Sequence, residues 1–491
     1  MFAAAFAAAV LMPANAQVIR TTVAQGEIEG EAHDGYTLFK AIPYAEAPVG
    51  PLRWKKPVAK TPWNGVYKAA DWGTRPWQSG LGEMSEDCLY LGIQTPASSP
   101  SDRLPVFVNI HGGGFSTGSY RGTQDSFVKE GIVYVSIEYR LGSLGFMAHP
   151  ELSKEAGGLS GNYGLYDQIM ALQWIHDNIA AFGGDPEKVT IGGESAGGIS
   201  VAILCASPLC KGLFRGAISE SGSSHTPVFD QAHGGIGNNK TVKGAEGIGE
   251  ELQKSVGAKK FKDFRKMDAK AITEKSPYAA YFPVTDGVAI LGDEYTQYEK
   301  GNFNDVNLLI GYNNDEGSLF LQKGDLNSYR QTVISQFGDD ADKVFAAYPA
   351  SNDQEALWAL QDLMRDTMFG WGTWAWAKLQ EKYGKSDCYF YYFCQHAKGS
   401  RGATHVAEMP YVYSWMRGEI ADVDRHIAQI MPRYWINFIK TGDPNEDGIP
   451  YWPSYKSDEP TVMNVLNGFF LTTDPNPDKM ETLDGIMAKY R

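Results

Sequence analysis

The chain has 491 residues, of which 43% are hydrophobic and 21% charged, a composition typical of a folded globular protein rather than a disordered or low-complexity one. Its formal net charge is −14. Nucleic acids and anionic membranes are polyanions, so this charge argues against either as the main partner. Composition does not indicate the oligomeric state.

The N-terminus has the pattern of a secretory signal peptide. An apolar run from Phe2 to Met12 is followed by Ala14-Asn15-Ala16, a small-x-small cleavage pattern, although no Lys or Arg precedes the run. We therefore expect residues 1–16 to be removed after Ala16, giving a secreted or periplasmic protein. The alternative is a buried N-terminal helix. No later segment has the length and apolarity of a membrane span, so no membrane anchor is expected.

The five cysteines are an odd number for an exported chain, so at least one must be free or intermolecular; they are Cys88, Cys205, Cys210, Cys388 and Cys394. Cys388 and Cys394 lie in one predicted strand, roughly 20 Å apart, and cannot pair with each other. Cys205 could pair with Cys210 if the chain turns at Pro208. No spacing suggests a zinc site.

Strands and helices alternate along the chain, which predicts an α/β fold with a large, mostly parallel sheet. The buried runs 104–111 and 131–140 predict strands, residues 166–182 a helix, and residues 189–192 a strand that a helix follows at once. Further strands are expected at 213–222, 306–313 and 388–395. We expect residues 17–491 to form a single catalytic domain, with helical insertions near 223–280 and 320–385 over the active-site edge.

Two serines fit the G-x-S-x-G pattern of a nucleophilic hydrolase, Ser116 in GFSTG and Ser195 in GESAG. A nucleophile elbow needs a strand, a sharp turn and an immediate helix. VTIGG before Ser195 and AGGISVAILCA after it meet this requirement, whereas Ser116 is followed by a loop without a helix signal. We therefore predict Ser195 as the nucleophile.

The glycines in HGGGF (111–115) suit an oxyanion hole. A tetrahedral intermediate carries a negative oxygen that preorganised backbone N–H groups stabilise. We assign the amides of Gly113 and Gly114 as donors, with the amide of Ala196 as the third. Taken alone, the stretch could equally be an ordinary glycine-rich turn.

Over nearly its whole length the chain resembles the type-B carboxylesterase family, which includes the cholinesterases. The matching motifs occur in order: FKAIPYAEAPVGPLRW (39–54), SEDCLYL (85–91), HGGGF, EYRLGSLGF (138–146), FGGDPEKVTIGGESAGG (182–198), GYNNDEGS (311–318), GATHVAEMPYVY (402–413) and WINFIKTGDPN (435–445). This resemblance implies an α/β-hydrolase fold flanked by helices.

The resemblance also implies the other two triad members. The acid in GYNNDEGS maps to Glu316 rather than Asp315, and the base in GATHVAEMPY maps to His405 rather than to its rivals His396 and His426. The chain order Ser–Glu–His is the one expected for this fold.

Further features are implied by the resemblance. Ion pairs are expected between Arg53 and Glu86 and between Arg140 and Asp185. Glu194 is expected to line the alcohol side of the pocket or to cap the following helix. Pocket walls or core packing are expected for a set of aromatic residues: Phe115, Phe369, Trp371, Trp374 and Trp376. No cysteine precedes Cys88, so the cysteine-closed loop of cholinesterases cannot form, which argues against an acetylcholinesterase.

The sequence therefore predicts an exported serine carboxylesterase that hydrolyses a small-molecule or polymeric ester through an acyl-serine, without metal or cofactor. The alternatives are a non-catalytic adhesion or binding module, or a lipase or amidase on the same fold. Because a histidine base must be neutral, activity is expected to fall as the pH drops through roughly 6 to 7.

Overall fold

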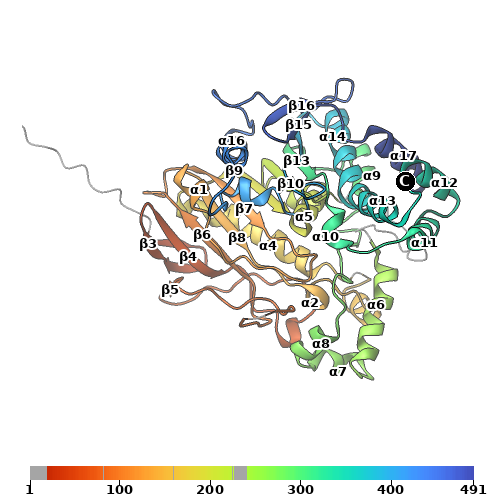
Figure 1. The fold of residues 1–491 in the computed structure, drawn as a ribbon. Coiled ribbons are helices and arrows are strands. Elements are labelled where there is room, and N and C mark those ends of the chain that lie inside the picture. Colours follow the sequence, from red (N-terminus) through yellow and green to blue (C-terminus); the bar gives the residue numbers. More distant parts are fainter. Residues whose placement is uncertain (1–18, 81, 159, 224, 226–239) are drawn as a thin grey trace, which may run out of the picture.

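An eleven-stranded sheet forms the centre of the computed structural model, which describes residues 19–80, 82–158, 160–223, 225 and 240–491 (Figure 1). The strands, in spatial order, are β16 (Phe469–Thr472), β15 (Val462–Val465), β14 (Cys388–Phe393), β13 (Asn307–Asn313), β10 (Gly216–Glu220), β9 (Gly184–Glu194), β7 (Leu104–Ile110), β8 (Val133–Ile137), β6 (Tyr90–Thr95), β4 (Tyr36–Pro43) and β3 (Glu31–His33). All neighbours from β15 to β8 pair in parallel, and the strands at either edge are antiparallel. The predicted mostly parallel sheet is confirmed.

Two small sheets accompany the large one. One contains β1 (Arg20–Val23), β2 (Gly26–Glu29) and β5 (Val66–Lys68); the other pairs β11 (Lys240–Thr241) with β12 (Val284–Thr285). The sequence predicted no strand in 223–280, whereas the structure contains the short strand β11 there. A two-residue strand in a Lys- and Gly-rich segment has no hydrophobic alternation by which to be detected.

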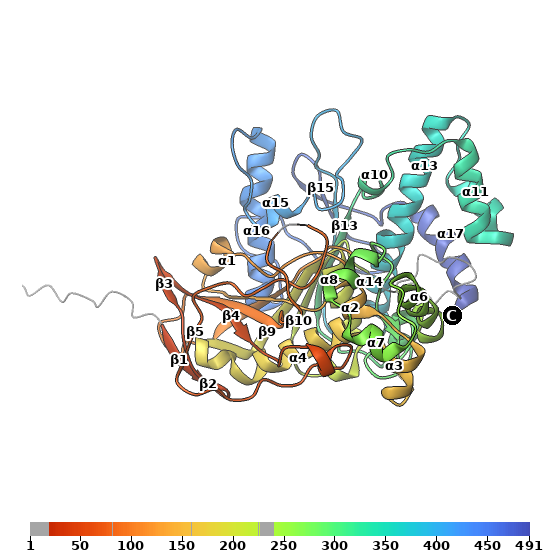
Figure 2. The same cartoon turned by 90° about the horizontal axis from the view of Figure 1, so that it is seen from below.

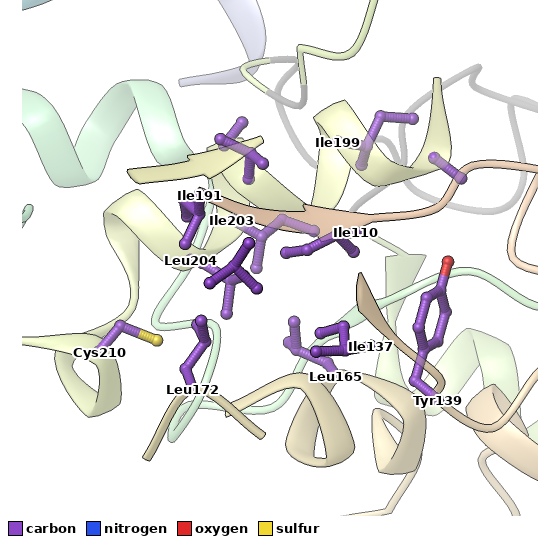
Figure 3. Packing of buried hydrophobic residues seen from close by; sticks show 14 of the residues in the cluster. Ile110, Ile137, Tyr139, Leu165, Leu172, Ile191, Ile199, Ile203, Leu204 and Cys210 are labelled. Carbon is purple, nitrogen blue, oxygen red and sulfur yellow. The ribbon is translucent and has the colours of Figure 1, made fainter. Parts of the chain in front are cut away.

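Alternating side chains along β7 separate two hydrophobic layers. Val106, Val108 and Ile110 belong to one buried cluster, and Phe107 belongs to the other. In the first layer, side chains of the sheet meet those of two helices, as Figure 3 shows for Ile137 and Leu165. Full burial of such a side chain contributes about 1.5–3 kcal/mol, which fixes the helices against the sheet.

Helices cover both faces of the sheet. The first layer contains α4 (Tyr163–Asn178), α5 (Ala196–Ala206) and α14 (Trp371–Tyr383), and the second contains α1 (Asp125–Lys129), α15 (Met409–Val412) and α16 (Asp422–Thr441). The predicted helix 166–182 corresponds to α4 and the 3-10 turn Ile179–Phe182, and it begins three residues earlier than expected.

The remaining helices lie mainly at one side of the molecule, opposite β3 and β5 (Figures 1 and 2). They are α2 (Gly142–Phe146), α3 (Pro150–Glu155), α6 (Val242–Ser255), α7 (Phe261–Lys266), α8 (Ala269–Lys275), α9 (Glu294–Glu299), α10 (Gly317–Phe320), α11 (Leu326–Phe337), α12 (Ala341–Ala347), α13 (Asp353–Arg365) and α17 (Pro477–Met487). The helical character expected for 320–385 is confirmed. No helix within the described ranges is long and apolar enough to cross a membrane.

One of the two expected ion pairs is present. Arg53 Nε donates to Glu86 Oε1 at 2.5 Å. Arg140 instead binds Asp167, with Nη2 2.7 Å from Oδ1, and both side chains are buried. The expected Arg140–Asp185 pair is therefore wrong. Asp167 lies on α4, which packs beside α2, so tertiary contact rather than a local motif selects the partner of Arg140.

All five cysteines are buried and free, so Cys205 and Cys210 do not pair. The predicted signal peptide, residues 1–16, lies outside the described residues.

Candidate active site

Ser195 occupies the turn between β9 and α5, with φ 56° and ψ −124°. A non-glycine residue at positive φ is strained, and such strain is characteristic of a serine at a strand-to-helix turn. The Ser195 amide donates to the carbonyl oxygen of Glu220 at 2.9 Å, which continues the β9–β10 pairing into the turn. This bond holds the strained residue at the end of the strand.

The glycines beside Ser195 are required by close backbone contacts. A Cβ on Gly193 would lie 2.4 Å from the Ile110 carbonyl oxygen, and one on Gly197 would lie 2.0 Å from the same atom. The N-terminus of α5 therefore packs directly on the end of β7. Only glycine permits this approach, which explains the G-x-S-x-G spacing in physical terms.

Glu316 and His405 form a buried acid–imidazole pair. Glu316 follows β13, His405 lies in the loop after β14, and the His405 Nδ1–H donates to Glu316 Oε2 at 2.6 Å. The other carboxylate oxygen of Glu316 accepts from Ser221 Oγ at 2.5 Å and from the Asn313 amide at 2.7 Å. These contacts fix the orientation of the imidazole. Parallel strands end at one sheet edge, which brings these loops together.

Glu194 faces the other nitrogen of the imidazole. His405 Nε2 lies 3.1 Å from Glu194 Oε1. Within the described part of the chain, Ser195 Oγ has no hydrogen-bond partner, so the structure does not contain a Ser195–His405 hydrogen bond. Since Glu194 is the direct neighbour of Ser195, Nε2 nevertheless lies at the serine turn. Glu194 does not cap α5, whose N-terminus has no side-chain cap.

Three further buried carboxyl groups belong to this cluster: Glu194 and Glu408 act on the His405 imidazole, and both also act on Glu220. Burial raises the pKa of Glu194 to about 8 and that of Glu408 to about 7, and it raises the pKa of Glu220 well above the ordinary range. Glu220 and Glu408 each have one buried carboxylate oxygen without a hydrogen-bond donor among the described residues. Burial alone would lower the pKa of His405, but Glu316 and Glu194 outweigh it and raise the pKa to about 9. The cluster therefore retains protons at neutral pH.

The glycine-rich loop lies against the serine turn. A Cβ on Gly112 would lie 3.2 Å from Ser195 Cβ and 2.5 Å from the Glu194 carbonyl oxygen. Gly113 and Gly114 have φ values of 105° and 60°. Their amides have no hydrogen-bond acceptor within the described residues, and the Ala196 amide is in the first turn of α5, where no intrahelical acceptor exists. All three N–H groups are thus available to an oxyanion.

Replacing Gly113 by alanine is expected to lower kcat by about 10²–10³-fold, the loss typical of removing one oxyanion donor. A Cβ at this position would lie 2.3 Å from the Thr117 carbonyl oxygen, and the backbone has positive φ, so the loop must shift. Ester hydrolysis by the purified variant measures the effect. Gly485→Ala is the control because its Cβ would meet open space; equal losses in both variants would contradict the prediction.

The loop is anchored by a pair that the sequence prediction missed. His111 Nε2 contacts Glu138 Oε1 at 2.9 Å, and Ser119 Oγ donates to Glu138 Oε2 at 3.1 Å. The hydroxyl of Tyr139 donates to the His111 carbonyl oxygen at 2.7 Å. Glu138 and Tyr139 lie in the EYRLGSLGF motif, which could have indicated a role but not this partner. Ser221 was missed because nothing local links it to the triad, whereas Glu408 lies three residues after His405 in the GATHVAEMPYVY motif, which was the available signal.

The expected pocket residues are divided between two places. Phe369 stacks on His405 with ring centroids 5.0 Å apart, and Phe320, which was not predicted, lies at the same distance. The Trp371 and Trp374 indoles instead donate to Asp484 and Asp474, near the C-terminus, and Trp376 donates to Tyr298. Phe115 is fully buried against Phe146 and Phe282. Of the five aromatic residues, only Phe369 contacts His405.

Two cavities of about 400 and 460 Å³ adjoin α4, and both are lined by Lys56 and Tyr166. Neither is lined by Ser195, Glu316 or His405. The strain at Ser195 and the Glu316–His405 contact identify the site.

Comparison with known proteins indicates the family and the fold of the chain. The carboxylesterase family matches residues 15–481. The para-nitrobenzyl esterase of Bacillus subtilis (strain 168) is 33% identical over 94% of this chain and 98% of its own length. A fumonisin B1 esterase of Sphingopyxis macrogoltabida is 33% identical over 88% of this chain and 83% of its own. A solved pNB esterase superposes with a TM-score of 0.83 at 30% identity, covering 94% of this chain and 99% of that one. The predicted fold is thus confirmed.

Proposed function

Because the chain belongs to the carboxylesterase family and is a carboxylic ester hydrolase, we propose that it cleaves esters through an acyl-serine formed on Ser195, with His405 as the base and Glu316 as the acid. The observation that carries this assignment is the 2.6 Å contact between His405 Nδ1 and Glu316 Oε2 at the edge where Ser195 stands at a strained turn.

The reaction begins when His405 Nε2 takes the proton of Ser195 Oγ as this oxygen attacks the ester carbonyl carbon. Nε2 must first leave Glu194 and turn to the neighbouring serine, and catalytic hydrogen bonds commonly tighten only when substrate is bound. Glu316 keeps Nδ1 protonated and stabilises the imidazolium. The amides of Gly113, Gly114 and Ala196 hold the oxyanion.

The imidazolium then gives its proton to the leaving alcohol, and the carbon–oxygen bond to the alcohol breaks. Water attacks the acyl-serine by the same route, with His405 again as the base, which releases the carboxylic acid and restores the Ser195 hydroxyl. The chain's own residues supply every proton transfer in this scheme.

We propose carboxylic esters, small or polymeric, as substrates. The two relatives named above are called esterases of different compounds, fumonisin B1 and para-nitrobenzyl esters, so the family resemblance does not select one ester. A p-nitrophenyl butanoate assay, with and without an alkyl fluorophosphonate, tests the mechanism. We expect the reagent to abolish turnover. Mass spectrometry should then show one phosphonyl group on the peptide that contains Ser195. An adduct elsewhere, or turnover that the reagent leaves intact, would contradict it. An anilide of the same acid distinguishes an amidase, and an emulsified triglyceride distinguishes a lipase.

We further propose export, on the basis of the apolar run and the Ala14-Asn15-Ala16 pattern. Expression of the full chain in a Gram-negative host, followed by intact-mass analysis of the periplasmic and culture fractions, should yield a protein that begins at Gln17. Active protein that keeps residues 1–16 in the cytoplasmic fraction would refute export without affecting the proposed chemistry.

The pH dependence of kcat/KM follows from the charge around His405. A base must be neutral, and the pKa of His405 is raised to about 9, so activity should be lost as the pH falls through about 9. This pH lies above the range of 6 to 7 expected from the sequence. Glu194→Gln removes one carboxylate that raises this pKa. The acidic limb should then move to lower pH by about one unit, or 1.4 kcal/mol.

The measurement is a pH profile of kcat/KM for the wild type and the Glu194→Gln variant. Glu299→Gln, on the exposed end of α9, is the matched control and should leave the limb in place. If the acidic limb of the kcat/KM profile moved to higher pH in Glu194→Gln, Glu194 would not favour the protonated imidazole.

A further inference from the structure

The second G-x-S-x-G serine is engaged in a contact that the proposed mechanism does not use. Ser116 Oγ accepts a hydrogen bond at 3.0 Å from the amide of Ala279, 163 residues later in the chain. The adjacent Phe115 ring packs edge-on against Phe282, with centroids 5.6 Å apart. Two neighbouring residues of the oxyanion loop thus contact one short segment, 277–282.

This segment carries a tyrosine whose hydroxyl lies at the oxyanion loop. Tyr278 Oη is 3.4 Å from the position of a Cβ on Gly114, whose amide is one of the proposed oxyanion donors. The side chain is 67% exposed, and its hydroxyl has no hydrogen-bond partner within the described residues. Ala279 has φ 53°, a strained value that its bond to Ser116 helps to maintain.

We propose that Ser116 is a positioning residue that fixes segment 277–282 on the oxyanion loop, and that Tyr278 thereby offers its hydroxyl to the acyl group of the substrate, favouring acyl groups with a hydrogen-bond acceptor near the carbonyl. The inference rests on the proposed function, because the carbonyl oxygen held by Gly113 and Gly114 belongs to the acyl group. That group stays in place through both half-reactions, so Tyr278 contacts it before and after the alcohol leaves.

The chemistry of the contact is simple. A phenol hydroxyl donates to an ether, hydroxyl or carbonyl oxygen, and a hydrogen bond of this kind changes a rate ratio by about 3–10-fold. Methoxyacetyl and butanoyl groups have the same length and shape and differ by one ether oxygen in place of a methylene. Their p-nitrophenyl esters therefore isolate the contribution of one acceptor.

The experiment compares kcat/KM for p-nitrophenyl methoxyacetate with that for p-nitrophenyl butanoate. In Tyr278→Phe the methoxyacetate-to-butanoate ratio should fall about 3–10-fold relative to the wild type, because the donor is lost. The ratio of p-nitrophenyl to methyl butanoate, which differ only in the alcohol, should stay within twofold. Tyr451→Phe, another exposed tyrosine, is the matched control and should change neither ratio.

The role of Ser116 is tested in the same assay. Ser116→Ala should lower the methoxyacetate preference as Tyr278→Phe does, and Ser116→Thr, which keeps the hydroxyl, should restore it. Because Tyr278 is exposed, its variant should fold even if Ser116→Ala does not. Hydrolysis in Tyr278→Phe with an unchanged acyl ratio would overturn this inference alone, whereas a wild-type protein without a Ser195 adduct would overturn the proposed mechanism.

Discussion

Ser195→Ala is expected to lower kcat for p-nitrophenyl butanoate by on the order of 10⁴- to 10⁶-fold, because no other group at the β9–α5 turn can form the acyl intermediate. The residual rate comes from the oxyanion amides and substrate binding. Pre-steady-state kinetics with excess substrate provide the measurement, since the wild type should release a burst of p-nitrophenol and the variant should not. Alanine leaves the positive φ of this turn strained, so circular dichroism must first show that the variant is folded.

Ser116→Ala is the informative comparison, because Ser116 stands in the same five-residue pattern. Its hydroxyl accepts a hydrogen bond from the Ala279 amide, and Ser116 does not stand at a strand-to-helix turn. We expect the variant to keep at least about a tenth of the wild-type kcat for butanoate, as for the loss of one neutral hydrogen bond. A loss in Ser116→Ala that matches or exceeds the loss in Ser195→Ala would transfer the nucleophile to Ser116.

Glu316→Gln is expected to reduce kcat by about 10⁴-fold, the loss seen when a triad carboxylate becomes an amide. The amide has nearly the same shape, but its NH₂ group can donate to His405 Nδ1 and thereby favour the wrong tautomer, in which Nε2 carries the proton and cannot act as a base. Steady-state kcat and KM for p-nitrophenyl butanoate are the measurements; kcat should fall and KM should change little.

Asp315→Asn is the control for this change, since Asp315 is the neighbouring carboxylate in the same motif. It pairs with Arg401 and does not contact His405 in the described contacts. We expect it to lower stability, because it weakens a partly buried ion pair, but to keep kcat of the folded protein within about tenfold of the wild type. If Asp315→Asn abolished turnover while Glu316→Gln retained it, the acid would be misassigned.

The buried carboxyl groups give the site an unusual charge balance. Glu194, Glu220, Glu316 and Glu408 are all nearly or fully buried, and His405 is the cation that contacts two of them. Neighbouring carboxyl groups cannot all ionise in a low-dielectric site, so some of these four groups keep their protons. A proton held near Glu194 is therefore available when the imidazole exchanges this partner for Ser195.

Local patterns in the sequence determined the main elements of this protein and the order of its motifs. The strand, turn and helix around Ser195 are encoded within about twenty residues, because an apolar β-branched run, flanking glycines and a helix-forming stretch each act on neighbouring backbone. The β strands at 306–313 and 388–395 were predicted within two residues at each end for the same reason.

Only the tertiary structure decided which side chains meet. Arg140 selects Asp167 instead of Asp185, Ser116 meets Ala279, and Glu408, at the start of α15, joins a carboxyl cluster with Glu220 of β10. Trp371 and Trp374, close to Phe369 in the chain, turn away from His405 because a helix directs successive side chains to different faces. Contacts between distant residues depend on how helices pack on the sheet, and local sequence carries little information on that packing, whereas backbone conformation is set by the nearest neighbours.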